Sequence, residues 1–216
     1  MLDFQTIFES FPMLIQAAQM TVFVSVAGLL IGFLIAVAVA SACLSRVAIA
    51  RRIGSSYVFF FRGVPLIVQL MLVYYFLPTV GINVPPLVAA IVAISLCEGA
   101  YLGEILRGGF LGIPRGQLEA TQLLGFSRYD TLLRIQIPQA LKLTTPSLIS
   151  EMILLVKASS LISVVGVAEI TRTAQNIVAT TFTPLEIYLA AGFMYFVING
   201  LLSLAGHFAE RRYARS

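Results

Sequence analysis

The chain has 216 residues, of which 59% are hydrophobic and 11% charged, with a formal net charge of +4. Globular domains contain about 25% charged residues, so this composition excludes an ordinary soluble domain and indicates lipid as the solvent. The basic residues lie in short segments between apolar runs, where they indicate membrane orientation and not nucleic-acid binding.

Long uncharged runs identify the membrane spans. No Asp, Glu, Lys or Arg lies between Glu9 and Arg46, or between Arg62 and Glu98. Each gap exceeds the roughly 20 residues that a helix needs to cross the hydrocarbon core. The first run is too long, and its start too acidic, for a cleavable signal peptide. Five spans are predicted, at about residues 20–44 (entering as early as Phe11), 57–77, 84–106, 143–167 and 185–208.

These spans are expected to be helices, because a backbone in lipid must satisfy its own hydrogen bonds. Gly28 and Gly32, like Gly99 and Gly103, have the four-residue spacing that lets helices approach closely. Cys43 and Cys97 both fall in apolar runs and are expected to pack as small hydrophobic residues without a disulfide. The sequence predicts an all-α integral membrane protein with a single transmembrane domain over residues 1–216.

The distribution of Lys and Arg predicts the orientation. On one side they lie after the first span, between the third and fourth spans and in the tail: Arg46, Arg51, Arg52, Arg107, Arg115, Arg128, Arg134, Lys142, Arg211, Arg212 and Arg215. The segments on the other side contain only Arg172. Because basic residues accumulate on the cytoplasmic side, the N-terminus is expected outside and the C-terminus in the cytoplasm.

Residues 108–138 form an unusually polar segment for so apolar a chain. Pro114 suits the first position of a helix, and Gly125 suits a left-handed cap at its end. Ser127 and Asp130 have a spacing close to a capping box, which predicts a second short helix that stops before Pro138. The residues alone leave two interpretations open: an element that docks on another protein, or an amphipathic hairpin on the lipid headgroups.

This segment resembles a known signature. Glu119-Ala120-Thr121, Gly125 and the run Ile135-Gln136-Ile137-Pro138 resemble the EAA signature of ABC importer permeases, from which Thr121 and Ile137 depart conservatively. The resemblance implies that the segment contains coupling helices, which dock in a cleft of the ATPase subunit. The residues expected to serve this coupling are Pro114, Glu119, Ala120, Thr121, Gly125, Ile135 and Pro138.

Further segments resemble the polar amino-acid permeases. The run RGVPLIVQL at 62–70 is similar to the RGTPLLVQL stretch of the histidine, glutamine and glutamate type, and residues 100–109, 137–140, 159–169 and 181–186 also fit. The resemblance implies a multi-pass protein of the bacterial cytoplasmic (inner) membrane. It also implies three partners: an ATPase dimer that uses ATP and Mg, a second permease subunit, and an extracytoplasmic substrate-binding protein.

Ionisable residues inside the spans are candidates for function, since each costs about 2.5–3.5 kcal/mol at the bilayer centre. Glu98 and Lys157 are predicted to face the translocation pathway and meet the ammonium and carboxylate of a substrate. They are alternatively a structural bridge, with Lys157 paired to Glu98 or Glu151. For Arg62 the competing interpretation is an arginine that reaches the cytoplasmic headgroups. The candidate pathway residues are Glu98, Lys157, Ser159, Ser160, Glu151 and Arg62.

Two further features bear on this prediction. Glu104 lies three residues before Arg107, which predicts an ion pair on the helix surface. The family often has an acidic residue directly after the lysine in the fourth span, where this chain has Ala158, and this difference disfavours a strongly cationic substrate.

Other functions fit the sequence less well. The chain lacks the G-x-x-x-x-G-K-[ST] phosphate loop, so it is not expected to hydrolyse ATP itself. An intramembrane hydrolase is disfavoured by a single histidine and no G-x-S-x-G motif, and neither a catalytic nor a metal site is predicted. An ATP-independent channel or ion-coupled carrier of small polar solutes remains the alternative, although it leaves the EAA-like segment unexplained.

Overall fold

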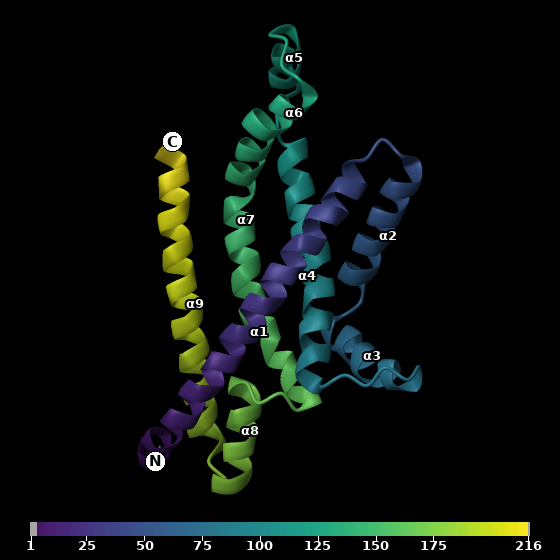
Figure 1. Cartoon of the computed structure of the whole chain (residues 1–216). Helices are drawn as coiled ribbons and strands as arrows, with labels where there is room; N and C mark the ends of the chain where they lie inside the picture. Colours follow the sequence, from purple (N-terminus) through teal and green to yellow (C-terminus); the bar gives the residue numbers. More distant parts are fainter. Residues whose placement is uncertain (1–3, 216) are drawn as a thin grey trace.

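The computed structural model describes residues 4–215, and this range is helical, with short connections (Figure 1). The side chains of residues 212–215 are not described. The prediction that Arg212 and Arg215 belong to the basic, cytoplasmic side therefore lies outside the described residues. The elements are α1 (Phe4–Leu44), α2 (Ala48–Gly63), α3 (Leu66–Thr79), α4 (Pro86–Leu111), α5 (Arg115–Leu123), α6 (Arg128–Asp130), a π-helical segment (Thr131–Gln136), α7 (Ile137–Ala158), a 3-10 segment (Ser159–Val165), α8 (Ile170–Thr181) and α9 (Pro184–Arg215).

Four of the predicted spans correspond to continuous helices. Within the described residues, α1, α4, α9 and the run that includes α7 are each long and apolar enough to cross a membrane. The helix α1 begins at Phe4, earlier than expected, because the polar residues before Phe11 are compatible with helix outside the apolar run. The prediction of an all-helical membrane protein is confirmed.

The second predicted span is wrong as a continuous helix. The chain bends by 102° between α2 and α3, so the pair forms either one broken span or a re-entrant loop. The cause is Pro65, which has no N–H for the i−4 hydrogen bond and disfavours helical backbone at Val64. Val64 accordingly adopts extended backbone, and α3 points to the side of the layer while still contacting α4 (Figure 1).

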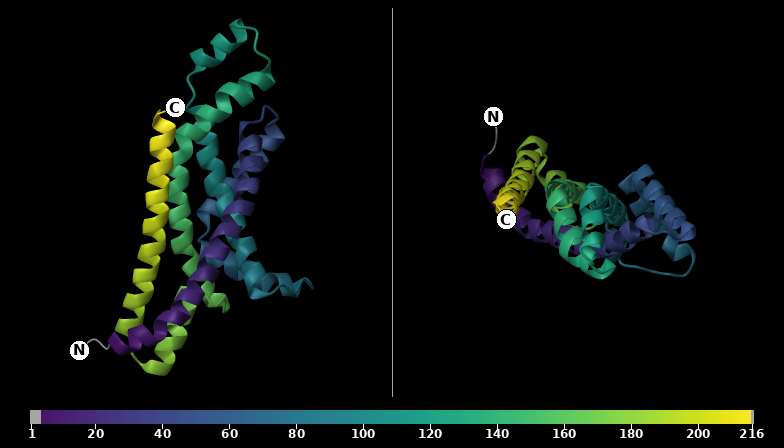
Figure 2. Two further views of the ribbon diagram at one scale, coloured as in Figure 1. Left: turned by 60° about the vertical axis from the view of Figure 1, so that its left-hand side comes forward. Right: turned by 90° about the horizontal axis from the view of Figure 1, so that it is seen from above.

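The helices form a flat, elongated layer when seen along the long axis (Figure 2). In this view α9 lies at one side and α2 at the other, with α7 and α4 between them, and α1 crosses the layer diagonally. The helix α1 contacts α2, α4, α7, α8 and α9.

Glycines allow a close contact between α1 and α4 in this layer. A Cβ atom on Gly28 would lie 2.5 Å from Ile94 Cγ2, and one on Gly32 would lie 2.7 Å from Glu98 Cβ. On α4, a Cβ at Gly99 would meet Ile35 at 2.5 Å. Both predicted glycine pairs therefore belong to one interface, where the missing side chains let the two backbones approach.

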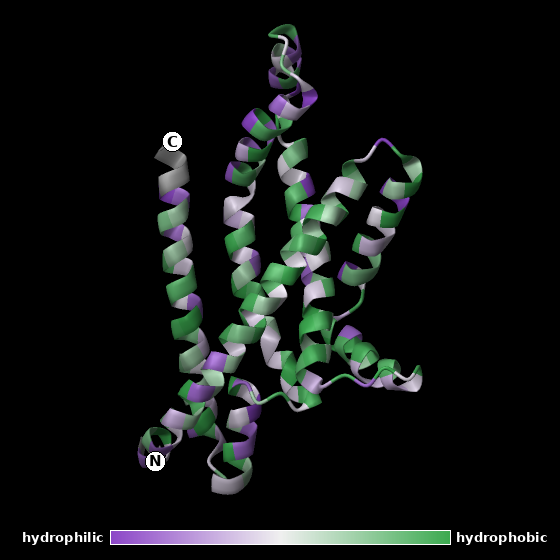
Figure 3. Cartoon of the chain, viewed as in Figure 1, coloured by the Kyte–Doolittle hydropathy of each residue, from purple (hydrophilic) through white to green (hydrophobic). Residues whose placement is uncertain are grey.

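The two ends of the layer differ in composition. The C-terminal ends of α1 and α9 lie toward the same end as α5 and α6, and the N-terminus and α8 lie at the opposite end (Figure 1). Hydrophobic residues dominate the middle of the helices, whereas hydrophilic residues gather at the α5–α6 tip and near α8 (Figure 3). The basic segments assigned to one side thus share one end of the molecule.

The short helix α8 was missed by the sequence analysis, and a buried carboxylate anchors it. Glu169 is fully buried and accepts hydrogen bonds from the backbone N–H groups of Thr171 (2.9 Å) and Arg172 (2.7 Å), which caps the start of α8. The hydroxyl of Tyr195 on α9 donates to the same carboxylate at 2.7 Å. From α1, Thr21 accepts from the N–H of Ile170 at 3.3 Å. Three helices meet at this network.

The stability of this network is expected to depend on pH. Burial raises the pKa of Glu169 above its ordinary value, although the hydrogen bonds from Thr171 and Tyr195 oppose the shift. The folded state thus binds this proton more tightly than the unfolded chain, and the resulting stabilisation is lost as pH rises through the folded pKa. Thermal unfolding in detergent should show a stability difference between wild type and Glu169→Gln that changes with pH in this sense. The exposed Glu9→Gln variant is the control, and a pH-independent difference for Glu169→Gln would contradict the prediction.

Candidate functional site

The polar segment forms a protruding tip with a glycine corner. The helix α5 follows Pro114 and ends at Leu123, and Gly125 adopts a left-handed conformation with φ +79°. Gly125 N–H donates to the carbonyl of Gln122, and Phe126 N–H donates to that of Thr121, both at 3.0 Å. This pair of hydrogen bonds is a Schellman motif, and it requires positive φ at the glycine. The predicted cap at Gly125 is confirmed.

The second helix of the tip begins as predicted. The Ser127 hydroxyl accepts from Asp130 N–H at 3.0 Å and also donates to the Asp130 carboxylate at 2.6 Å. Asp130 forms an ion pair with Arg134 at 3.2 Å. Thr131 donates to the buried Thr121 hydroxyl at 3.3 Å, which holds the two helices of the tip together.

The prediction that this helix stops before Pro138 is wrong. The chain continues as helix from Arg128 through the π-helical segment into α7. Pro138 lacks the N–H that would bond the fourth preceding carbonyl, and its ring clashes there in a regular α-helix. The wider π turn, in which Ile137 N–H donates to Leu132, accommodates the proline. The tip is therefore continuous with a membrane-spanning helix.

The tip exposes apolar side chains beside charged ones. Leu123, Leu124 and Tyr129 are 89%, 74% and 70% exposed. Glu119 and Ala120 are also exposed on α5. In Figure 2 the tip stands beyond the ends of the other helices. Large apolar side chains next to charges at the end of a rigid helix suit contact with another protein.

Within the membrane-spanning layer, Glu98 is the most buried of the candidate pathway residues that carry a charge. It lies midway along α4 against Gly32 of α1, is 5% exposed, and has one carboxylate oxygen without a hydrogen-bond partner. Its electrostatic neighbour is Glu151, which is half-buried on α7. Two interacting carboxylates in an apolar layer favour the binding of a cationic group.

Arg62 provides a positive charge that acts on Glu151. It lies in the last turn of α2 rather than one turn into the span, because α2 begins at Ala48. Its guanidinium stacks over the ring of Tyr101, 5.3 Å from the centroid, and interacts electrostatically with Glu151. The structure therefore places Arg62 at the end of α2 away from Ala48, where it contacts Tyr101 and acts on Glu151.

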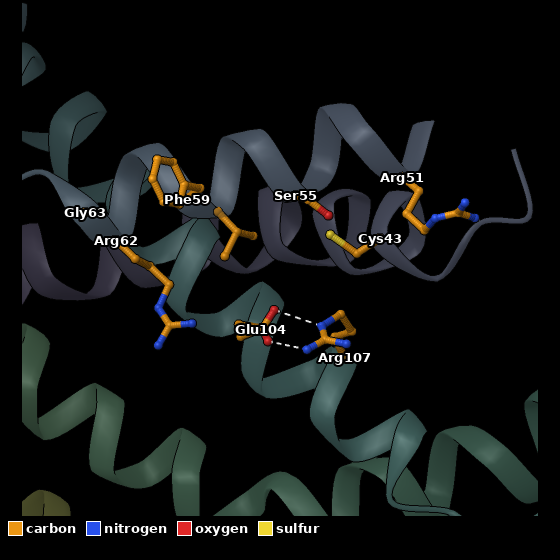
Figure 4. Close-up of a pocket in the computed structure, with 9 residues that line it drawn as sticks. Cys43, Arg51, Ser55, Phe59, Arg62, Gly63, Glu104 and Arg107 are labelled. Carbon is orange, nitrogen blue, oxygen red and sulfur yellow. Dashed lines mark hydrogen bonds and ion pairs between the residues drawn. The ribbon is translucent and has the colours of Figure 1, made fainter. Parts of the chain in front are cut away.

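A cavity of about 620 Å³ extends from Arg62 toward the basic end of the layer, between α1, α2 and α4. Figure 4 shows Arg62 on one side of Glu104 and Arg107 on the other. Arg107 Nε donates to Glu104 at 2.9 Å, which confirms the predicted ion pair. Arg51 also lines the cavity, so three guanidinium groups and a single carboxylate make it electropositive.

The remaining candidates are separate from this cluster. Lys157 is exposed, and among the described residues it makes no ion pair with Glu98 or Glu151. Ser159 is fully buried, and its hydroxyl donates to the carbonyl of Val156 at 2.8 Å. The Ser160 hydroxyl donates to the carbonyl of Lys157 at 2.7 Å. Both serines thus bond within their own helical turn.

Two contributors were missed by the sequence analysis. Tyr101 entered the sequence analysis only within residues 100–109, which resemble the family. No local pattern predicts its contact with Arg62, because Arg62 lies in another helix. The second is Gln69, which is 3% exposed and bonds across the bend between α2 and α3. A buried amide within an apolar run was the available signal for Gln69, since polar groups in lipid need partners.

Comparison with known proteins shows the family to which the chain belongs. Residues 28–215 match the family described as binding-protein-dependent transport system inner membrane component. The chain belongs to this family. It is therefore the membrane-spanning permease component of such a transporter, a multi-pass protein of the inner membrane, and not its ATPase.

Individual relatives narrow the comparison. The chain is 37% identical over 212 residues to the glutamine transport system permease protein GlnP of Escherichia coli K12, which covers 97% of each chain. It is 38% identical to the L-cystine transport system permease protein TcyB of Bacillus subtilis, over 94% of this chain and 88% of the relative. A crystal structure of an amino acid ABC transporter with histidines superposes with a TM-score of 0.93, at 33% identity, over 98% and 99% of the two chains. An inward-facing MetNI methionine transporter, 21% identical with a TM-score of 0.73, shares the fold.

Proposed function

We propose that this permease subunit of an ABC amino-acid importer passes its substrate along the face that holds Glu98, Glu151 and Arg62. An amino acid carries an ammonium and a carboxylate, and these match the acidic pair and the guanidinium respectively. The observation that supports the proposal most directly is the buried Glu98, whose free oxygen needs a donor that the described residues do not supply. The cavity that Arg62 lines extends this polar face toward the basic end of the layer.

The second part of the proposal concerns the partners. The flat layer leaves the pathway open at one side, so a second permease subunit, either a copy of this chain or a related one, is needed to close it. The α5–α6 tip docks on an ATPase dimer that uses ATP and Mg, and an extracytoplasmic binding protein delivers substrate to the opposite end. The family description, which names binding-protein-dependent transport, supports this arrangement.

The proposed orientation follows from the same arrangement. The tip and the basic segments share one end, which we place in the cytoplasm, with the N-terminus and α8 outside. ATP binding then closes the ATPase pair and moves the two tips together. Because the tip is continuous with α7, this motion reaches Glu151 through a single run of helix. Glu98 and Lys157 remain candidates for gating the pathway in other states.

The test is substrate uptake by proteoliposomes that contain the assembled transporter and its binding protein. Glu98→Gln and Glu151→Gln keep the size of each side chain and remove its charge. Each is expected to raise the substrate concentration for half-maximal uptake by about tenfold, because a charge-assisted hydrogen bond contributes roughly 1.5–3 kcal/mol. Lys157→Met tests whether that residue also faces the pathway.

The control is Glu9→Gln, which removes an exposed carboxylate from α1 without altering the acidic pair. Wild-type uptake kinetics for both Glu98→Gln and Glu151→Gln, in complexes that assemble normally, would exclude the proposed pathway. Wild-type kinetics for Lys157→Met alone would remove only Lys157 from it.

A further inference from the structure

The bend between α2 and α3 is spanned by one side chain. Gln69, in the first turn of α3, directs its amide back toward α2 and is 3% exposed. Its Nε2 group donates to the carbonyl of Phe61 at 2.8 Å and to that of Val64 at 2.7 Å. One amide group thus bonds backbone on the other side of a 102° turn.

Without Gln69, neither carbonyl would have an N–H donor from the backbone. In a continuous helix, the carbonyl of Phe61 would accept from residue 65, but Pro65 has no N–H. Val64 lies outside both helices, and Val68 N–H bonds the carbonyl of Pro65 instead. In lipid no water replaces these hydrogen bonds, and an unpaired carbonyl costs several kcal/mol. The Gln69 amide therefore supplies the donors that the bend removes.

Two hydrogen bonds link α2 to α4. The Cys97 thiol lies 3.9 Å from the same Phe61 carbonyl, and the Tyr57 hydroxyl donates to the carbonyl of Leu96 at 2.6 Å. Arg62 follows Phe61 directly, so the position of its guanidinium over Tyr101 depends on how α2 ends. A change in the bend would rotate this last turn and move Arg62 relative to α4.

We propose that Gln69 is a positioning residue, which holds the bend between α2 and α3 and thereby places Arg62 over Tyr101. The role in transport rests on the proposed function of Arg62, whereas the role in the bend does not. Gln69 itself contacts backbone and is not assigned to the substrate.

The first experiment measures the bend. Cysteines that carry spin labels replace Phe59 on α2 and Tyr75 on α3, which are both exposed. The full transporter is used, with Cys43 replaced by alanine. Wild type is expected to show one narrow distance distribution, and Gln69→Leu a shifted or broadened one. The matched control is Asn199→Leu, because the Asn199 amide donates within its own helix, to the carbonyl of Tyr195. An unchanged distribution in Gln69→Leu overturns the proposal.

The second experiment is a double-mutant cycle on uptake with Gln69→Leu, Arg62→Ala and the double variant. Gln69→Leu is expected to raise the half-maximal substrate concentration about tenfold, the loss of roughly one net hydrogen bond. The double variant should be no worse than Arg62→Ala, because Gln69 acts through Arg62. If the fold-changes of the two single variants multiply in the double variant, the positioning role is overturned and only a structural role is left.

These outcomes separate the two proposals. If Arg62→Ala takes up substrate as wild type does, the proposed role of Arg62 in the pathway fails, and the spin-label distances still decide whether Gln69 holds the bend. If Gln69→Leu fails to assemble, Gln69→Glu retains the shape and loses the amide donors. It is expected to change the distances in the same direction, and an unchanged distribution overturns the proposal.

Discussion

Replacing Gly125 by valine is expected to abolish ATP-driven uptake and release the ATPase from the purified complex. Gly125 has φ +79°, and a β-branched residue there costs about 1–2 kcal/mol or more of backbone strain. The strain breaks the hydrogen bonds of the Schellman motif. The exposed Leu124 and Tyr129 are then no longer held in fixed positions relative to each other. Copurification of the ATPase with a tagged permease measures docking directly, beside uptake into proteoliposomes.

The matched control is Gly125→Asn at the same position. Asparagine tolerates the left-handed conformation. A Cβ at Gly125 meets nothing within 4 Å, so a steric clash does not explain a difference between the two variants. Gly125→Asn should therefore retain most of the ATPase and most of the uptake. Equal retention by the valine and asparagine variants would show that the glycine corner is not needed for docking.

Adding one methyl group at Gly99 is expected to destabilise the chain, whereas the same change at Gly108 on the same helix is not. A Cβ at Gly99 would lie 2.5 Å from Ile35 Cγ2 and 3.0 Å from the Tyr57 hydroxyl, but one at Gly108 meets nothing within 4 Å. Overpacking costs about 1–3 kcal/mol. Against it, alanine gains up to about 1 kcal/mol of helix propensity over glycine at either position.

The measurement is thermal unfolding of the two alanine variants in the same detergent. Gly99→Ala is expected to unfold at a lower temperature than wild type, and Gly108→Ala at the same or a higher temperature. Gly32→Ala, on the α1 side of the interface, should behave like Gly99→Ala because its Cβ would meet Glu98 at 2.7 Å. Similar shifts at Gly99 and Gly108 would contradict the assignment of the glycine pairs to a close α1–α4 contact.

Much of the fold was predictable because lipid restricts the choices. Long uncharged runs located the spans, and the spacing of Gly28, Gly32, Gly99 and Gly103 indicated close helix contacts. The structure adds that these glycines face one another across a single interface. The α2–α3 bend was not predicted, because the apolar run 57–77 is long enough for a straight span and hydropathy does not register Pro65.

The candidate site was predicted only in part. Intramembrane charge drew attention to Glu98, Glu151 and Arg62, since each is costly in lipid. The sequence left the partner of Lys157 open, as either a substrate in the pathway or a bridge to Glu98 or Glu151. The structure places Arg62, from a separate helix, over Tyr101 and within electrostatic range of Glu151. The sequence pattern contains no information about that packing.

The sequence by itself determined the membrane environment, the helical class, the distribution of basic residues and the glycine corner at Gly125. These properties depend on local composition and on backbone preferences of single residues, which act over a few turns of chain. Only the tertiary structure decided that α2 and α3 are bent, that Gln69 spans the bend, and that Arg62 lies over Tyr101. Such features depend on contacts between helices that are distant in sequence, where packing and hydrogen-bond satisfaction in lipid select one arrangement.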